Sequence, residues 1–224
     1  MKVTRLQVAS LCVLLCFIFI ACGTVASVRP IGEGNKSLAF SIAGPVAPVY
    51  DVKMPIPYSV LRYRLGLNDD TDLHFGLHPT IALFADLGAD VGLTKHFMRN
   101  KGARPGVSAG LSLYGFYHFG DGSSVRLYPC VTLMATYDVS KRFPVLYLGA
   151  ESMIQFAEPY VVPVFLVGGQ LAVSNRFTLG LEAKWYAPFE SGDDRVVDYV
   201  ITPLGQGAVG FAVGLSYAFQ GRQP

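Results

Sequence analysis

Residues 207–219 read GAVGFAVGLSYAF, and this stretch decides the fold class. From Val209 to Phe219, every second residue is large and apolar or aromatic, and the residues between them are Gly, Ala or Ser. Successive side chains of a strand point to opposite faces, so a period of two predicts a β-strand. Neither face carries a charge. The stretch is therefore typical of a barrel wall with lipid on one side and a confined interior on the other.

Three residues near the end of this stretch form a motif. Gly214, Tyr217 and Phe219 give Gly-x-x-Tyr-x-Phe, and a tail at residues 220–224 follows them. This ending resembles the closing-strand signal of bacterial outer-membrane β-barrels. The resemblance implies that outer-membrane lipid surrounds the folded chain and that the barrel-assembly machinery binds its C-terminal strand.

The composition supports a membrane β protein. The 224 residues are 51% hydrophobic and 15% charged, whereas soluble domains average about 25% charged residues. Beyond the first twenty-odd residues no apolar run is long enough for a spanning helix, which needs about 18 residues or more. The formal net charge is +2 and the sequence has no run of Lys or Arg, so we expect no nucleic-acid partner. The length suits one domain.

Nine other stretches alternate in the same way. The sequence therefore predicts an all-β fold, an antiparallel up-and-down transmembrane β-barrel of about ten strands over residues 36–219. The expected strands are residues 36–43, 59–67, 71–78, 86–97, 105–119, 125–138, 145–156, 161–174, 177–189 and 207–219. The segments 44–57, which contains four prolines, 79–85 and 190–206 are expected to be loops. Short polar connections alternate with longer ones, as periplasmic turns and external loops do in such barrels.

Two orientations of the alternating faces are open to such a barrel. In a soluble, lipocalin-like ligand-binding lipoprotein, the large apolar residues would point inward. A narrow lumen has little room for them, and the other face is too rich in Gly, Ser and Ala for a large solvated surface. The sequence therefore favours apolar residues outward and polar residues inward.

With that orientation, many charged residues point into the lumen. The residues expected to form a lumenal charge network are Arg62, Arg64, Asp86, Asp90, Arg126, Glu151, Glu182 and Lys184. Further inward polar residues are Asp72, Asp138, His74, His78, His96 and His118. Buried charges must be paired, so an ion network that fills the barrel is the favoured interpretation, and a catalytic or selectivity lining is the alternative. The sequence has no HExxH, GxSxG or P-loop motif, so we expect no cofactor, no metal and no enzymatic activity.

The N-terminus has the layout of an export signal, with Lys2 and Arg5 before the apolar residues 6–20. Residues 19–22, Phe-Ile-Ala-Cys, resemble a bacterial lipobox. This resemblance implies a signal peptide at residues 1–21, acylation of Cys22 with palmitate-type chains, and a tether at residues 22–35. Ordinary cleavage after Ala26, where Thr24 and Ala26 are the small residues, is the alternative.

The remaining cysteine has no expected partner. Cys130 lies outside the signal, so the sequence predicts no disulfide framework and a small inward-facing filler at this position. The whole pattern is similar to that of the small structural and adhesin-like barrels of Gram-negative bacteria. It implies a structural, surface-interacting or narrow passive-pore role, with an envelope enzyme acting on lipid or peptide at the barrel rim as the alternative.

Overall fold

The computed structural model describes residues 25–49, 52–55, 58–101, 104–119, 123–138, 145–156, 158–191 and 202–220. The signal peptide and Cys22 lie outside these residues, as do tail residues 221–224. Among the described residues, no helix has both the length and the apolar character needed to span a membrane.

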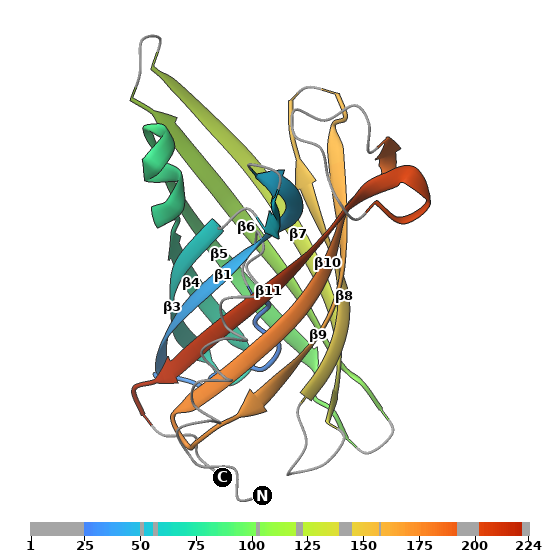
Figure 1. Ribbon diagram of the computed structural model, residues 1–224. Helices are drawn as coiled ribbons and strands as arrows, with labels where there is room; N and C mark the ends of the chain where they lie inside the picture. The colour runs from blue at the N-terminus through green and yellow to red at the C-terminus, as the bar shows by residue number, and fades with distance from the viewer. Residues whose placement is uncertain are drawn as a thin grey trace, which may run out of the picture.

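Ten long strands form a closed antiparallel barrel (Figure 1). They are β1 Lys36–Val49, β3 Tyr58–Asn68, β4 Thr71–Leu77, β5 Asp86–Met98, β6 Gly106–His118, β7 Ser124–Asp138, β8 Val145–Ile154, β9 Val161–Ala172, β10 Phe177–Ser191 and β11 Gln206–Ala218. Each long strand pairs with the next one along the chain, and β11 pairs with β1 to close the barrel. In that closing ladder Ser41 lies opposite Gly214 and Leu38 lies opposite Tyr217. The predicted fold is confirmed.

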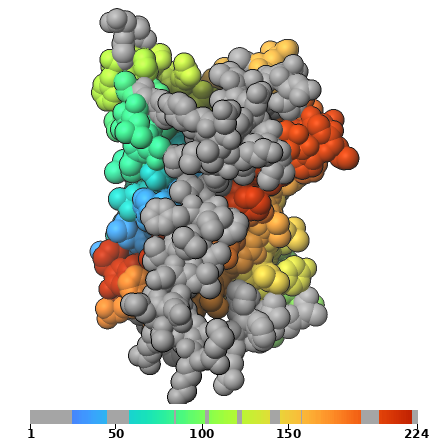
Figure 2. All heavy atoms as spheres, viewed as in Figure 1, coloured from blue at the N-terminus to red at the C-terminus, as the bar shows by residue number. Residues whose placement is uncertain are grey.

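The two ends of the barrel differ. One end carries the turns at residues 69–70 and 173–176, and we call it the short-turn end. β1 begins and β11 ends there, and we call the opposite end the long-loop end. The strands are strongly tilted: β11 runs obliquely from the upper right to the lower left of Figure 1, and the dark red atoms at the lower left of Figure 2 mark the end of the described chain after it.

The prediction of a loop at residues 44–57 is wrong. β1 continues to Val49, and β2, Val52–Pro55, folds back and pairs with it. The prolines suggested a loop because proline cannot donate to a ladder. A short edge strand tolerates proline, however, since one side of it needs no partner.

The expected loops at residues 79–85 and 190–206 also contain regular structure. Pro79–Phe84 forms a 3₁₀ helix, η1, and Pro203–Gly205 forms a second, η2. Each helix has a proline in its first turn, where a missing N–H costs nothing. β10 also extends to Ser191, two residues further than predicted, after a register shift against β11.

Side chains on the wall are arranged inside out relative to a soluble barrel. On β10, Leu181 is 54% exposed while its neighbour Glu182 is 3% exposed. The same outward pattern recurs around the barrel, with large apolar side chains exposed on every long strand. The inner face carries buried polar side chains on most strands, together with buried apolar ones such as Val164 and Leu166 on β9 and Ala212 on β11. A surface of this kind is stable only against hydrocarbon, so the chain is a transmembrane barrel. The lipocalin-like interpretation is wrong.

Candidate functional site in the barrel lumen

The lumen holds an ion cluster built on Asp90. Asp90 lies on β5, and its side chain is fully buried. Its Oδ1 accepts a charged hydrogen bond from Nη2 of Arg62 on β3, over 2.9 Å. Two histidines of the β4 region complete the cluster. Nε2 of His78 lies 3.0 Å from Oδ2, and Nε2 of His74 lies 3.5 Å from Oδ1. Gly76 of β4 leaves the space that the carboxylate fills, because a Cβ at that position would overlap it.

Tyr58 extends this cluster toward the long-loop end. Nε2 of His78 faces the Asp90 carboxylate, and its Nδ1 lies 2.6 Å from the Tyr58 hydroxyl. In the neutral ring with its proton on Nε2, the hydroxyl donates to Nδ1. These contacts satisfy the polar groups of both side chains. Tyr58 and His78 are not among the residues that line the two cavities described for this part of the chain.

A second ion cluster lies between β8 and β10. Nζ of Lys184 is 3.0 Å from Glu151 and 3.2 Å from Glu182. The side chains of Lys184 and Glu182 are 3% and 0% exposed, respectively. One buried ammonium group thus pairs with two carboxylates, so a neutral residue in place of Lys184 would leave both carboxylates without this cation.

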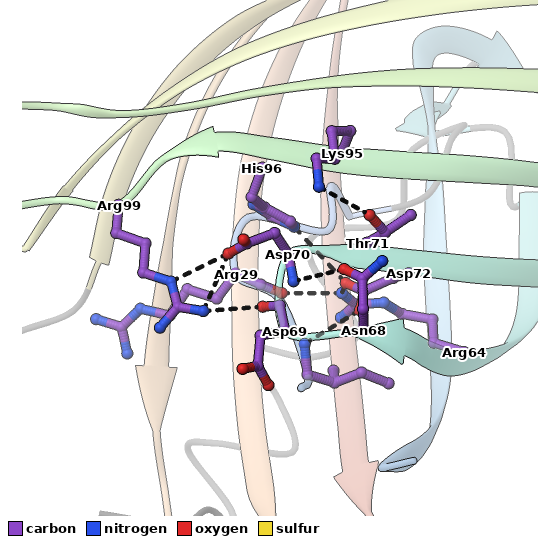
Figure 3. A network of polar contacts seen from close by, with 11 residues as sticks. Arg29, Arg64, Asn68, Asp69, Asp70, Thr71, Asp72, Lys95, His96 and Arg99 are labelled. Carbon is purple, nitrogen blue, oxygen red and sulfur yellow. Dashed lines mark hydrogen bonds and ion pairs between the residues drawn. The ribbon is translucent and has the colours of Figure 1, made fainter. Parts of the chain in front are cut away.

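A third polar network lies at the short-turn end (Figure 3). Arg64 of β3 pairs with Asp72 of β4 at 2.5 Å and also donates to the carbonyl of Arg29 over 2.9 Å. The other Asp72 oxygen accepts the backbone N–H of Ile31, at 3.3 Å. Arg29 in turn pairs with Asp138 at the end of β7. At the turn outside the lumen, Arg99 and Asp70 form an exposed pair.

Residues 25–35 run inside the barrel, and we call them the internal strap. Figure 1 shows this blue segment within the lower part of the barrel before β1. The strap begins beside β10 and β11, where Val25 lies close to Gly180 and Gly214. It ends at β3, where Gly66 bonds to the backbone of Gly34 and Asn35 at 3.0 Å each. The sequence predicted a tether for residues 22–35, but residues 25–35 are packed against the inner wall.

The strap has its own apolar anchor. Val28 is 2% exposed and belongs to a buried cluster. The other members of that cluster are Ala26, Met134, Val145, Tyr147 and Leu166. Small residues suit this position because the lumen is narrow, and the same small residues made the segment look like a linker in the sequence.

Among the described residues, two cavities border the strap. The larger, of about 640 Å³, lies at the short-turn end and is bordered by strap residues and by basic side chains that include Lys36, Arg64 and Arg176. The smaller, of about 40 Å³, is polar and is bordered by Ser108, Ser112 and other inward residues. The smaller volume suffices for buried water but not for a solute of metabolite size.

The predicted lumenal residues do not form one network. Arg62 joins Asp90, and Lys184 joins Glu151 and Glu182. Arg64 instead pairs with Asp72, one of the further inward polar residues that the sequence indicated. Sequence spacing could not assign these partners because pairing across strands depends on register.

Two of the predicted residues lie at the long-loop end. Asp86 is 2.9 Å from Nδ1 of His118, with both side chains more than a third exposed. Arg126 is exposed on β7 opposite Phe116, near the tip of the β6–β7 hairpin that rises beyond its neighbours (Figure 1). Arg126 therefore shares the inner face with Phe116 but is exposed and lies outside the two buried ion clusters.

The remaining predicted features have clear places. Cys130 is 4% exposed on β7, in the position expected of a small filler. Gly214 and Tyr217 lie in the closing strand β11, and Phe219 follows it. Recognition of these three residues by the assembly machinery stays a prediction. Within the described ranges, no group of three or more His, Cys, Asp or Glu residues could hold a metal ion.

Comparison with known proteins gives likenesses of fold. No family model and no curated protein matches the chain. The translocator domain of the autotransporter NalP from Neisseria meningitidis is 11% identical, with a TM-score of 0.46 over 84% of this chain and 89% of that one. The outer membrane protease OmpT from Escherichia coli is 10% identical, with a TM-score of 0.35 over 83% of this chain and 94% of that one. The anion-selective porin from Comamonas acidovorans is 15% identical, with a TM-score of 0.36 over 78% of this chain and 52% of that one. These likenesses concern the course of the chain alone.

Proposed function

We propose that this chain is a lipid-anchored protein of the bacterial outer membrane whose filled barrel conducts no solutes and serves a structural or surface-interacting role. The observation that carries the proposal is the occupied lumen. Two buried ion clusters, one on Asp90 and one on Lys184, lie above a strap that is bonded to the wall at both ends. Of the roles that the sequence allows, a narrow passive pore fits this interior least well.

The membrane location rests on the outer surface and the export signal. A belt of exposed apolar side chains needs hydrocarbon, and a closed barrel can span a bilayer because it leaves no unpaired strand edge. The proposal places the short-turn end at the periplasm, following the usual asymmetry of loop lengths. It places the lipid on Cys22, which precedes the strap in the chain.

The long-loop end supplies the surface for interactions. The β1–β2 extension folds over at this end, and the β6–β7 hairpin projects beyond its neighbours there (Figure 1). An envelope enzyme stays the alternative, and the half-exposed pair of His118 and Asp86 is the feature that favours it. If His118→Ala abolished a lipid- or peptide-cleaving activity of the folded protein, the enzyme would replace the proposed role.

Conductance in planar bilayers tests the filled lumen. The purified full-length protein, reconstituted at known density, is expected to give no reproducible current steps, because the ion clusters and the strap occupy the lumen. An open porin reconstituted at the same protein-to-lipid ratio serves as the positive control. Regular conductance steps that are absent from protein-free detergent controls would contradict the proposal.

A further inference from the structure

Two facing glycines form a notch for the first described residue of the strap. Gly180 of β10 lies opposite Gly214 of β11 in the ladder. A Cβ on Gly180 would lie 2.5 Å from Cγ1 of Val25, and a Cβ on Gly214 would lie 2.9 Å from its Cγ2. Contacts below about 3 Å are overlaps, so the Val25 side chain occupies space that any other residue at Gly180 or Gly214 would fill.

The peptide groups of Ala26 are also part of the folded interior. Its N–H donates to Oε2 of Glu182 over 3.1 Å, and its carbonyl accepts from Nε2 of Gln170 over 2.8 Å. Ala26 is 8% exposed, and the Glu182 side chain is fully buried. Glu182 shares Lys184 with Glu151, so the Ala26 N–H is an important additional donor to this carboxylate.

These contacts discriminate between the two signal-cleavage sites that the sequence leaves open. Hydrolysis of the bond after Ala26 would remove Val25 and Ala26, leaving the glycine notch empty and taking a donor from Glu182. It would also create a new α-ammonium group on Ser27, inside the lumen beside the small polar cavity. Cleavage before Cys22 keeps every one of these contacts.

We propose that Val25 and Ala26 are structural residues of the mature barrel, and that signal cleavage therefore occurs upstream of Val25 and not after Ala26. In this step one water molecule hydrolyses one peptide bond, and of the two bonds that the sequence offers, the Ala21–Cys22 bond is the one that satisfies the structure. The inference deepens the proposed function, because it rests on export to the outer membrane and makes the strap a permanent part of the filled lumen.

Mass spectrometry of protein purified from cell envelopes tests the cleavage site directly. We expect a tryptic N-terminal fragment in which Val25 and Ala26 are still joined to Ser27, ending at Lys36, because trypsin does not cleave the Arg29–Pro30 bond. Its mass would also show whether acyl chains are attached upstream. A fragment of residues 27–36 with a free α-amine on Ser27 would overturn the inference. If the Ser27 form conducted no current, the filled-lumen role would survive while this inference failed; a conducting barrel that retained Val25 would show the reverse.

A pair of substitutions tests whether Val25 occupies the notch. Gly180→Ala should lower the equilibrium ratio of folded to unfolded protein by about tenfold through overpacking. Val25→Gly, introduced into the same chain, should restore most of it because the clashing methyl groups are gone. Gly110→Ala, whose Cβ would meet no atom closer than 3.5 Å, is the matched control and should be near neutral. If Gly180→Ala left stability unchanged, or if Val25→Gly did not restore the lost stability, the packing of Val25 between Gly180 and Gly214 would be overturned. The mass of the wild-type N-terminal fragment tests the cleavage site independently of how well the variants fold.

Discussion

Lys184→Met is expected to destabilise the barrel by about 3–5 kcal/mol, the usual cost of removing one partner from a buried ion pair. Lys184 is the cation shared by Glu151 and Glu182. Without it, two carboxylates face each other in a lumen where water cannot replace the lost charge. Urea titration in lipid vesicles, followed by the gel shift between folded and unfolded forms, measures the change.

Lys95→Met is the matched control for this prediction. Lys95 is exposed on the outer face of β5, and its hydrogen bond to Thr71 is at the surface. Removing it should change stability by less than about 1 kcal/mol. Adding Glu182→Gln to Lys184→Met should recover part of the loss, because one uncompensated charge disappears. Equal effects of Lys184→Met and Lys95→Met would mean that the second cluster is not a buried one.

Gly66→Ala is the second change with a large expected effect. A Cβ at Gly66 would overlap the backbone carbonyl of Gly32 in the strap. Backbone cannot rotate away as a side chain can, and Gly34 and Asn35 hold the strap to Gly66 through two hydrogen bonds. Overpacking together with the loss of these bonds should cost about 3 kcal/mol and detach the strap from β3.

Limited digestion with a glutamate-specific protease from the short-turn side reports this detachment. Cleavage after Glu33 should be faster in Gly66→Ala than in the wild type, since the strap leaves the wall. Gly110→Ala again provides the control, because its added methyl group meets only ordinary contacts. Equal digestion rates for the two variants would refute a strap packed against β3.

The barrel itself was predictable because its signal is local. The alternation in residues 207–219 needs no knowledge of distant contacts, and β11 does have Leu215 exposed beside buried Gly214. The same reasoning placed every long strand to within a few residues, apart from the extension of β1. The extension of β1 could not be predicted because proline is tolerated only where a strand edge has no partner, and the sequence does not show which edges those are.

The candidate site was only partly predictable. Inward charges such as Asp90 and Glu182 follow from the period of two, but their partners depend on which strands meet and in what register. The strap was missed for a different reason. Val25 and Val28 lie in a short run without periodicity, and only the folded wall, with glycines at Gly180, Gly214 and Gly66, reveals that space was left for it.

A depth measurement on a single outward residue tests the central claim, that hydrocarbon surrounds the apolar face and the lumen is closed. Nitroxide labels would be placed at Leu181→Cys, which is outward and 54% exposed, and at Ser112→Cys, which is inward and 8% exposed, each in a Cys130→Ser background. In reconstituted vesicles the label at position 181 should collide with oxygen dissolved in the bilayer and not with a water-soluble nickel complex. The label at position 112 should collide little with either. A label at position 181 that is open to the nickel complex, or shielded from bilayer oxygen, would contradict the account.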